Sequence, residues 1–371
     1  MQDLEKAVRQ YADSSSFREA LCIPKKAEIF LSKLAQGECN VNFLLRRPGS
    51  GKNLVLRVNL ISQMHLADQA GYEYAALSAL SETGRTPKPL YLDSTARTGT
   101  GERIGNGLMV YEYLPGRPLN YRTDLSRAAA LLADIHSCPY PKQASSHGNV
   151  SLIEAHEPLH MILEECTEMF KIYQNARIAD PSVQMRIERM LDRGYAMLSD
   201  SRSDRRADSP AGASESSPKG DSESSDGSRW RCIINTELNS GNFLMNDGGR
   251  DYLIDWEKPL FGEPAQDLGH FLAPTTTFWK TDVLLTEEET EFFVKEYLRA
   301  AAGRFDTEGI EEALQTFIPI TCLRGLTWSA MAWVQYQDPA SSAPKNKDTW
   351  KKLCDYLSRD FLGMIEKRYF Q

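Results

Sequence analysis

Two carboxylates and one carboxamide within residues 230–273 have the types and spacing that metal-dependent chemistry needs. Glu237 and Asn242 lie in a polar turn that follows an apolar run, and Asp255 comes directly after another apolar run. Carboxylate and amide oxygens are ligands that Mg²⁺ prefers, and a positioned carboxylate can orient a hydroxyl group. These residues therefore predict a site that holds Mg²⁺ on a nucleotide and orients a hydroxyl.

Short strands must position these three side chains. Residues 246–249, Asn-Asp-Gly-Gly, are typical of a hairpin turn, so residues 243–245 and 252–254 are expected to pair as antiparallel strands. The loop with the first two groups would then precede one strand, and Asp255 would end the other.

The chain before residue 115 is expected to form a lobe that binds the nucleotide. The apolar pattern predicts a helix at residues 67–82 and strands at residues 29–34, 41–45, 54–58, 88–93 and 107–113. Arg57 lies inside an apolar strand, where a cation needs a partner, and Glu73 on the helix can supply a carboxylate. An outward-facing position on an edge strand is the alternative interpretation of Arg57.

Two other features of this segment suit a bound nucleotide. The glycine turn from Gly37 to Asn40 joins two predicted strands, and its backbone N–H groups can lie over phosphates. The last predicted strand runs into a proline-containing connector, so the backbone of Glu112 and Leu114 can meet an adenine ring. A core strand that ends in a simple turn is the alternative interpretation of this connector.

The rest of the chain is expected to be mainly helical. Apolar positions recur at helical spacing in residues 1–22, 124–137, 158–173, 183–198, 287–302, 308–336 (with a break expected near Pro319) and 347–369. Residues 200–229 have no large apolar side chain and are rich in Ser, Asp and Gly. This segment is therefore expected to be a disordered insertion.

The composition is ordinary for a globular protein and argues against several classes. Of the 371 residues, 41% are hydrophobic, enough for a large core, and the net charge of −8 argues against a general nucleic-acid binder. No apolar run approaches membrane-spanning length, and the first ten residues contain no apolar signal core. The seven cysteines follow no metal-binding spacing, so reduced thiols and a cytoplasmic location are expected.

In the order and spacing of these pieces, the chain resembles the aminoglycoside phosphotransferase / choline kinase family, small-molecule kinases with a protein-kinase-like fold. The likeness covers about residues 27–370, apart from the insertion. The family's catalytic loop, His-x-Asp-x-x-x-x-Asn, corresponds to residues 235–242. Its Ile-Asp-Trp metal motif corresponds to residues 254–256, and its Pro-x-x-Asp-Leu element to residues 264–268.

The resemblance implies an α+β, bilobal fold. An N-terminal helix in residues 1–26 would precede a small antiparallel-sheet N-lobe in residues 27–114, and a large, mainly helical C-lobe would follow in residues 115–371. ATP would be bound by Gly37, Asn40, Arg57, Glu73, Glu112 and Leu114. Mg²⁺ would be held by Asn242 and Asp255, with Glu257 as an auxiliary or second-ion ligand.

The resemblance also implies catalytic roles within the loop. Glu237 would accept the proton of the acceptor hydroxyl, Asn235 would support the loop, and Asp267 would hydrogen-bond the loop backbone. Two of these residues depart from the family pattern, because Asn235 replaces a histidine and Glu237 replaces an aspartate. The glutamate has a similar intrinsic pKa but is one methylene longer, and a misplacement of about 1 Å can cost about a hundredfold in rate.

The expected function is an ATP-dependent phosphotransferase that acts on a hydroxyl of a small molecule. The alternative is a degenerate kinase-like protein that binds nucleotide or metabolite without turnover. A protein kinase is disfavoured because the run from Glu257 to Asp267 leaves little room for an activation segment. The acceptor pocket is expected within residues 158–198 and 287–369. Trp328, Trp333 and Trp350 are expected to pack the large lobe, and contact with the substrate is the alternative interpretation. No sequence feature identifies the acceptor or the oligomeric state.

Overall fold

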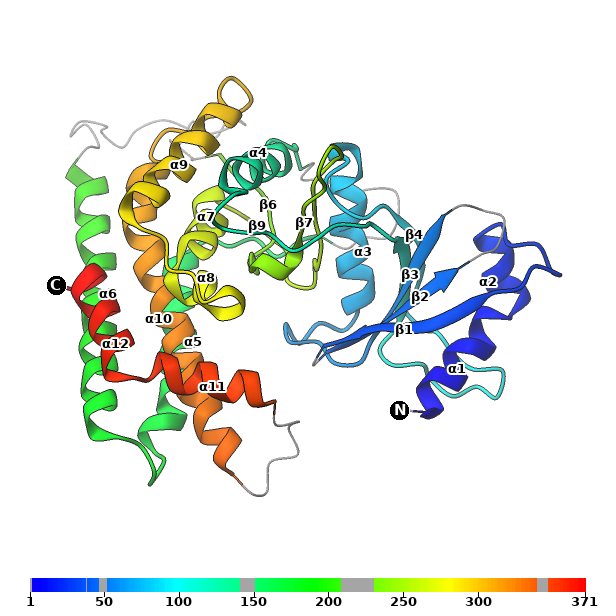
Figure 1. Ribbon diagram of the computed structural model, residues 1–371, viewed down its shortest axis with the longest axis horizontal. Helices are drawn as coiled ribbons and strands as arrows, with labels where there is room; N and C mark the ends of the chain where they lie inside the picture. The colour runs from blue at the N-terminus through cyan, green and yellow to red at the C-terminus, as the bar shows by residue number, and fades with distance from the viewer. Residues whose placement is uncertain (1, 38, 47–51, 141–150, 208–229, 339–345) are drawn as a thin grey trace, which may run out of the picture.

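A five-stranded antiparallel sheet forms the N-lobe, in the order β1-β2-β3-β5-β4 (Figure 1). The computed structural model describes residues 2–37, 39–46, 52–140, 151–207, 230–338 and 346–371. The strands of this sheet are β1 (Phe30–Gln36), β2 (Asn40–Arg46), β3 (Asn53–Asn59), β4 (Pro89–Asp93) and β5 (Leu108–Glu112). All five predicted strands are therefore present, close to their predicted bounds.

Three helices accompany the sheet: α1 (Gln2–Ala12), α2 (Ser15–Ala20) and α3 (Gln69–Leu80). Helix α3 lies on its C-lobe side, and α1 and α2 lie on the side away from the C-lobe (Figure 1). The prediction of one helix over residues 1–22 is wrong, because Ser14 begins a new helix by accepting the Phe17 N–H on its side chain at 3.4 Å. Phe17 then packs in the apolar core beneath the sheet.

The C-lobe is built mainly from helices, of which α5, α6 and α10 lie side by side (Figure 1). The helices are α4 (Leu125–His136), α5 (Pro158–Gln174), α6 (Pro181–Ala207), α7 (Pro264–Leu272), α8 (Pro274–Thr281), α9 (Glu287–Ala301), α10 (Ile310–Gln337), α11 (Lys347–Tyr356) and α12 (Arg359–Tyr369). Two antiparallel pairs carry the stretch with the polar loop: β6 (Cys232–Ile234) with β9 (Leu260–Gly262), and β7 (Phe243–Leu244) with β8 (Tyr252–Leu253). The predicted hairpin between residues 243 and 254 is confirmed.

Three helix predictions need correction. The helix predicted at residues 347–369 is two helices, because the Ser358 side chain accepts the Phe361 N–H at 3.2 Å and starts α12. Helix α10 continues through Pro319 without the break that was expected there. Helices α7 and α8 were not predicted, although each has a proline in its first turn, a common helix-start signal.

The predicted disordered insertion at residues 200–229 is partly wrong. Helix α6 extends to Ala207, and residues 208–229 lie outside the described residues. The α+β class, with an antiparallel-sheet N-lobe and a helical C-lobe, is confirmed. Among the described residues, no helix has both the length and the hydropathy to cross a bilayer.

Candidate active site

A cavity of about 520 Å³ lies between the two lobes. Eight of the predicted site residues line it: Gly37, Asn40, Arg57, Glu112, Leu114, Asn242, Asp255 and Glu257. Glu73 is fully buried and contacts Arg57 instead of the cavity. The fold thus gathers residues from the glycine turn, the β5 connector and the polar loop around one space.

Arg57 is buried on β3 and contacts three carboxylates. Its Nε lies 3.0 Å from Oε2 of Glu73, so the predicted pairing with the helix glutamate is present. Its Nη2 lies 3.1 Å from Oδ1 of Asp255 and 3.0 Å from Oε2 of Glu257. Because Arg57 is only 4% exposed, the alternative of an outward-facing edge residue is wrong.

Glu257 reaches the N-lobe through Asn40. Its Oε2 accepts a hydrogen bond from the Asn40 carboxamide, whose oxygen accepts one from Asn59 at 2.8 Å. The Asn40 side chain therefore holds Glu257 in position. Burial, together with the nearby Asp255 carboxylate, raises the pKa of Glu257 to about 7, although Arg57 opposes the shift.

The pKa of Glu257 predicts a pH-dependent stability. Between its ordinary value of 4.5 and about 7, folded Glu257 keeps a proton that the unfolded chain has lost. Raising the pH through this range therefore favours unfolding, and the metal-free protein should lose up to about 3 kcal/mol from this group. Urea unfolding at pH 5 and pH 7.5 checks this for the wild type and for Glu257→Gln, which cannot titrate. Parallel changes in the two proteins would contradict the prediction.

Asp267 on α7 holds the loop that carries Glu237. Its carboxylate accepts the N–H groups of Asn235 at 2.8 Å and Thr236 at 2.7 Å, as the resemblance implies. Asn235 accepts the Glu237 N–H at 3.0 Å and donates to the carbonyl of Asp255 at 3.0 Å. These bonds hold Thr236 and Asp255 in the left-handed backbone region, at φ 68° and 62°. Asn235 thus ties the loop to the segment after β8.

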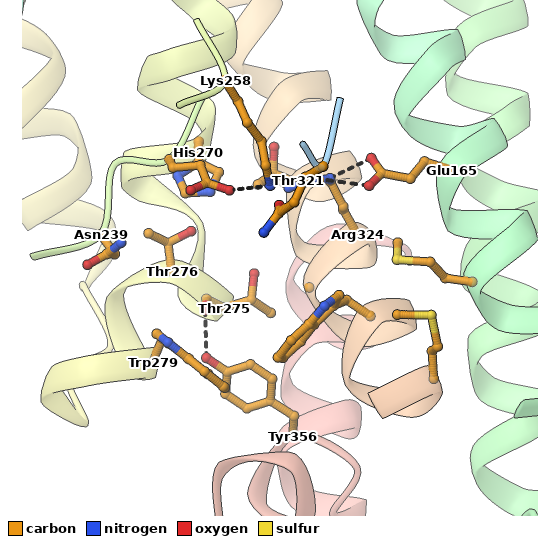
Figure 2. Close-up of a pocket in the computed structure, with 16 residues that line it drawn as sticks. Glu165, Asn239, Lys258, His270, Thr275, Thr276, Trp279, Thr321, Arg324 and Tyr356 are labelled. Atoms are coloured by element: carbon orange, nitrogen blue, oxygen red, sulfur yellow. Dashed lines mark hydrogen bonds and ion pairs between the residues drawn. The ribbon is translucent and has the colours of Figure 1, made fainter. Parts of the chain in front are cut away.

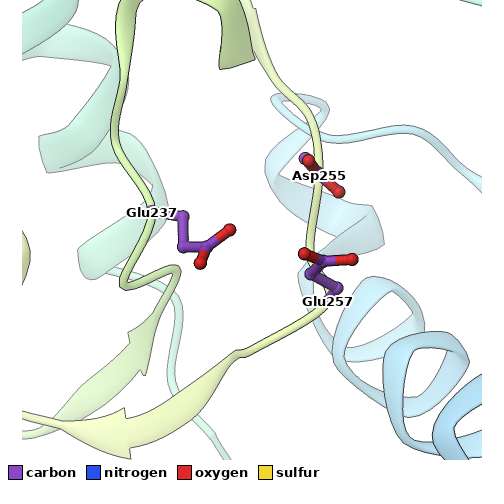
Figure 3. A group of neighbouring side chains, drawn as sticks. All are labelled: Glu237, Asp255 and Glu257. Carbon is purple, nitrogen blue, oxygen red and sulfur yellow. The ribbon is translucent and has the colours of Figure 1, made fainter. Parts of the chain in front are cut away.

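Three carboxylates converge beside this loop (Figure 3). Glu237, Asp255 and Glu257 each offer an oxygen, and these oxygens lie within 4.8 Å of one another. Asn242 donates its Nδ2 to the Glu237 carbonyl at 2.7 Å, which leaves its Oδ1 as an acceptor. An all-oxygen set of this kind fits a hard cation such as Mg²⁺.

Lys258 also contacts Glu237, and its place beside this loop was not predicted from the sequence. Its Nζ lies 2.6 Å from Oε1 of Glu237. Its position directly after Glu257 is a signal that could have found it. The ion pair leaves Oε2 of Glu237 to meet a ligand.

Glu237 also lines a second cavity, of about 510 Å³ (Figure 2). Its helical walls come from α5, α7, α8, α10 and α11. The ranges in which the acceptor pocket was predicted include α5, α10 and α11, but not α7 and α8. Trp328 lines this cavity with its edge against Trp279, at a centroid distance of 5.4 Å. Trp333 and Trp350 stack on each other at 6.2 Å.

His270 is a neutral hydrogen-bond donor in this cavity. The Leu238 N–H donates to its Nδ1 at 3.1 Å, so Nδ1 carries a lone pair. Burial, with help from Arg324 and Lys258, lowers the pKa of His270 to about 3. The ring is therefore neutral at pH 7, and its proton is on Nε2.

Polar groups in the 520 Å³ cavity fit a nucleotide. Oδ1 of Asn42 is buried and has no hydrogen-bond partner among the described residues. The backbone N–H of Leu114 likewise forms no hydrogen bond within the described part of the chain. Because an unsatisfied buried polar group is costly, Oδ1 of Asn42 is expected to bind a polar ligand, and the unbonded N–H of Leu114 can donate to the same ligand.

The chain matches the model of the phosphotransferase enzyme family over residues 31–313. No curated protein matches the chain at a significant level.

Solved structures of small-molecule kinases share this fold. The choline kinase from Cryptosporidium parvum matches with a TM-score of 0.59 and 11% identity, covering 97% of this chain and 94% of the other. A choline/ethanolamine kinase family protein from Mesorhizobium loti matches with a TM-score of 0.53 and 15% identity, over 98% and 99%. A spectinomycin phosphotransferase in complex with ADP and spectinomycin matches with a TM-score of 0.54 and 11% identity, over 92% of each chain. The predicted protein-kinase-like fold is thereby confirmed.

Proposed function

The chain belongs to the phosphotransferase enzyme family, and from this premise we propose that it transfers the γ-phosphoryl group of ATP to a hydroxyl of a small molecule. The observation that carries the proposal is the position of Glu237. It lines the 510 Å³ cavity, while its carboxylate lies within 4.8 Å of Asp255 and Glu257, which line the 520 Å³ cavity. An acceptor and a nucleotide in the two cavities would therefore meet at this carboxylate.

The 520 Å³ cavity is the proposed nucleotide site. The backbone of Glu112 and Leu114 would contact adenine, and the turn at Gly37 would cover the phosphates. Arg57 would bind phosphate oxygens through its planar guanidinium group, while Glu73 keeps that group oriented. The ADP in the related spectinomycin phosphotransferase supports this use of the fold.

Asn242, Asp255 and Glu257 are the proposed Mg²⁺ ligands. When bound, Mg²⁺ would neutralise charge on the phosphate oxygens during transfer. The Asn40 carboxamide would keep Glu257 directed at this site, and the Asn235 side chain would fix the backbone at Asp255.

In the proposed reaction, the acceptor hydroxyl oxygen forms a bond to the γ-phosphorus while the bond from that phosphorus to the β–γ bridging oxygen breaks. ADP leaves with the electrons of the broken bond, and the hydroxyl proton passes to the Glu237 carboxylate. Lys258 holds Oε1 of Glu237 at 2.6 Å, so Oε2 is directed to the acceptor.

A degenerate kinase-like protein that binds ligands without turnover is the second candidate. The Lys258–Glu237 ion pair favours it, because a cation already occupies one of the two oxygens of the carboxylate that would accept the proton. The replacement of the family's histidine and aspartate by Asn235 and Glu237 favours it as well.

Turnover with Mg-ATP distinguishes the two candidates. ADP formation is measured with a panel of alcohols, sugars, amino alcohols and hydroxy acids, and the phosphorylated acceptor is identified by mass spectrometry. We expect one acceptor phosphorylated per ADP formed, and Asp255→Asn should reduce turnover by about a hundredfold or more. ATP binding without phosphorylation of any acceptor, at the same affinity in Asp255→Asn, would support the binding protein instead.

A further inference from the structure

The 510 Å³ cavity and a neighbouring cavity of about 360 Å³ share one polar wall. The side chains common to both are Glu165, Lys258, His270, Thr321 and Arg324. The larger cavity also holds Glu237, the proposed proton acceptor. A group bound at this wall would therefore lie in the same cavity as Glu237.

Arg324 is held in a fixed position in this wall. It lies on α10 between buried apolar neighbours, and its Nε and Nη2 lie 2.7 and 3.0 Å from the two oxygens of Glu165 on α5. Nη1 has no acceptor among the described residues, so two N–H groups are available to a ligand. The two contacts with Glu165 hold the guanidinium group in one orientation (Figure 2), and Arg324 lines both cavities.

Lys258 and His270 add further donors beside Arg324. The Lys258 ammonium uses one of its three N–H groups on Glu237, and within the described part of the chain it has no other acceptor. His270 presents Nε2–H, since its Nδ1 accepts the Leu238 N–H. Donors at the wall therefore outnumber acceptors, because both oxygens of Glu165 and one oxygen of Glu237 are already used.

We propose that the acceptor substrate carries an anionic group, a carboxylate or a phosphate, which Lys258, His270 and Arg324 bind while its hydroxyl meets Glu237. This inference rests on the proposed function, because it names the class of acceptor. Charge-assisted hydrogen bonds to such a group would use the donors that the protein leaves without acceptors. A cationic group at the same wall would face Lys258 and Arg324 and would find few unused acceptor oxygens.

The two cavities also suggest the body of this acceptor. The 360 Å³ cavity is lined by apolar side chains, among them Ile153, Met161 and Ile162, and the larger cavity contains the Trp279–Trp328 pair. An acceptor with an apolar or aromatic body would cover these apolar linings while its anionic group contacts the polar wall. A small polyol would leave the apolar walls uncovered.

Calorimetric binding without nucleotide tests the proposal independently of turnover. Four para-substituted benzyl alcohols of similar size serve as probes, carrying a carboxylate, a phosphate, a carboxamide or an aminomethyl group. We expect the carboxylate or the phosphate to bind at least about 10-fold more tightly than the carboxamide, and the aminomethyl compound to bind most weakly. The stronger of the two anions identifies which group the wall recognises. Equal affinities, a preference for the amine, or no binding of any probe would overturn the proposal.

A paired variant assigns the selectivity to the wall. Arg324→Gln combined with Glu165→Gln removes both charges without leaving one unpaired, and it should reduce the preference for the anion by about 10- to 100-fold. Lys295→Gln combined with Glu291→Gln removes an exposed ion pair on α9 and serves as the matched control. If the double variant Arg324→Gln with Glu165→Gln kept the preference for the anion, the wall would not be its cause. Anion-selective binding without turnover would leave this proposal standing and count against the proposed function alone.

Discussion

Replacing Glu237 by glutamine is expected to lower the rate of phosphoryl transfer by about 10²- to 10⁴-fold while ATP binding changes little. Glutamine is nearly the same size, but its carboxamide cannot take the proton of the acceptor hydroxyl. Glu237 lines the 510 Å³ cavity and not the 520 Å³ cavity proposed for the nucleotide, so the nucleotide contacts should remain. Steady-state rates with Mg-ATP and the best acceptor, together with calorimetric ATP binding, measure the two effects separately.

The neighbouring lysine requires its own control in this experiment. Because Lys258 pairs with Glu237 at 2.6 Å, the variant also leaves a cation without its carboxylate. The double variant Glu237→Gln with Lys258→Met removes both charges. If its rate returned to the wild-type value, Glu237 would serve only to neutralise Lys258, and its role as proton acceptor would be refuted. Glu168→Gln, at an exposed ion pair on α5, should leave the rate unchanged.

The sequence was most informative where a charged residue lies in a locally apolar pattern and therefore requires a partner. Arg57 was identifiable because a cation in an apolar strand requires a partner, and Glu73 is indeed 3.0 Å away. The same reasoning would have found Arg324, which lies within the apolar run of α10. Lys258 gave a weaker signal, because its contact with Glu237 depends on how two loops fold together.

The same limit applies to the fold. The strands were predictable because runs of β-branched and apolar residues are separated by strong turn sequences. The local sequence is therefore enough to identify each strand. The helix break at Ser358 was not predictable, because the apolar spacing continues across it. Only the serine cap interrupts the helix there. Helix α8 was also missed, since its PTTTFWKT sequence lacks an apolar stripe. That omission hid two residues that line the 510 Å³ cavity, Thr275 and Trp279.

Replacing Arg57 by methionine is expected to destabilise the folded protein by about 3–5 kcal/mol, because it leaves a buried carboxylate without its cation. Glu73 is fully buried, and burial raises its pKa while the nearby Arg57 lowers it. Asn59 and Gln69 donate to Glu73 at 2.8 and 3.2 Å, but neither supplies a charge. The free energy of unfolding in urea, compared between wild type and variant at pH 7, measures the loss.

A second change at Glu73 tests the cause of that loss. Arg57→Met combined with Glu73→Gln should recover most of the stability, because a carboxamide oxygen still accepts from Asn59 and Gln69 without a charge. Arg57→Lys should be intermediate, since a compact ammonium cannot replace a planar fork that contacts three carboxylates. A loss below about 1 kcal/mol in the single variant, or no recovery in the double, would mean that folded Glu73 is already protonated. The network would then be held by hydrogen bonds, and Arg57 would be retained for the phosphates instead of for the fold.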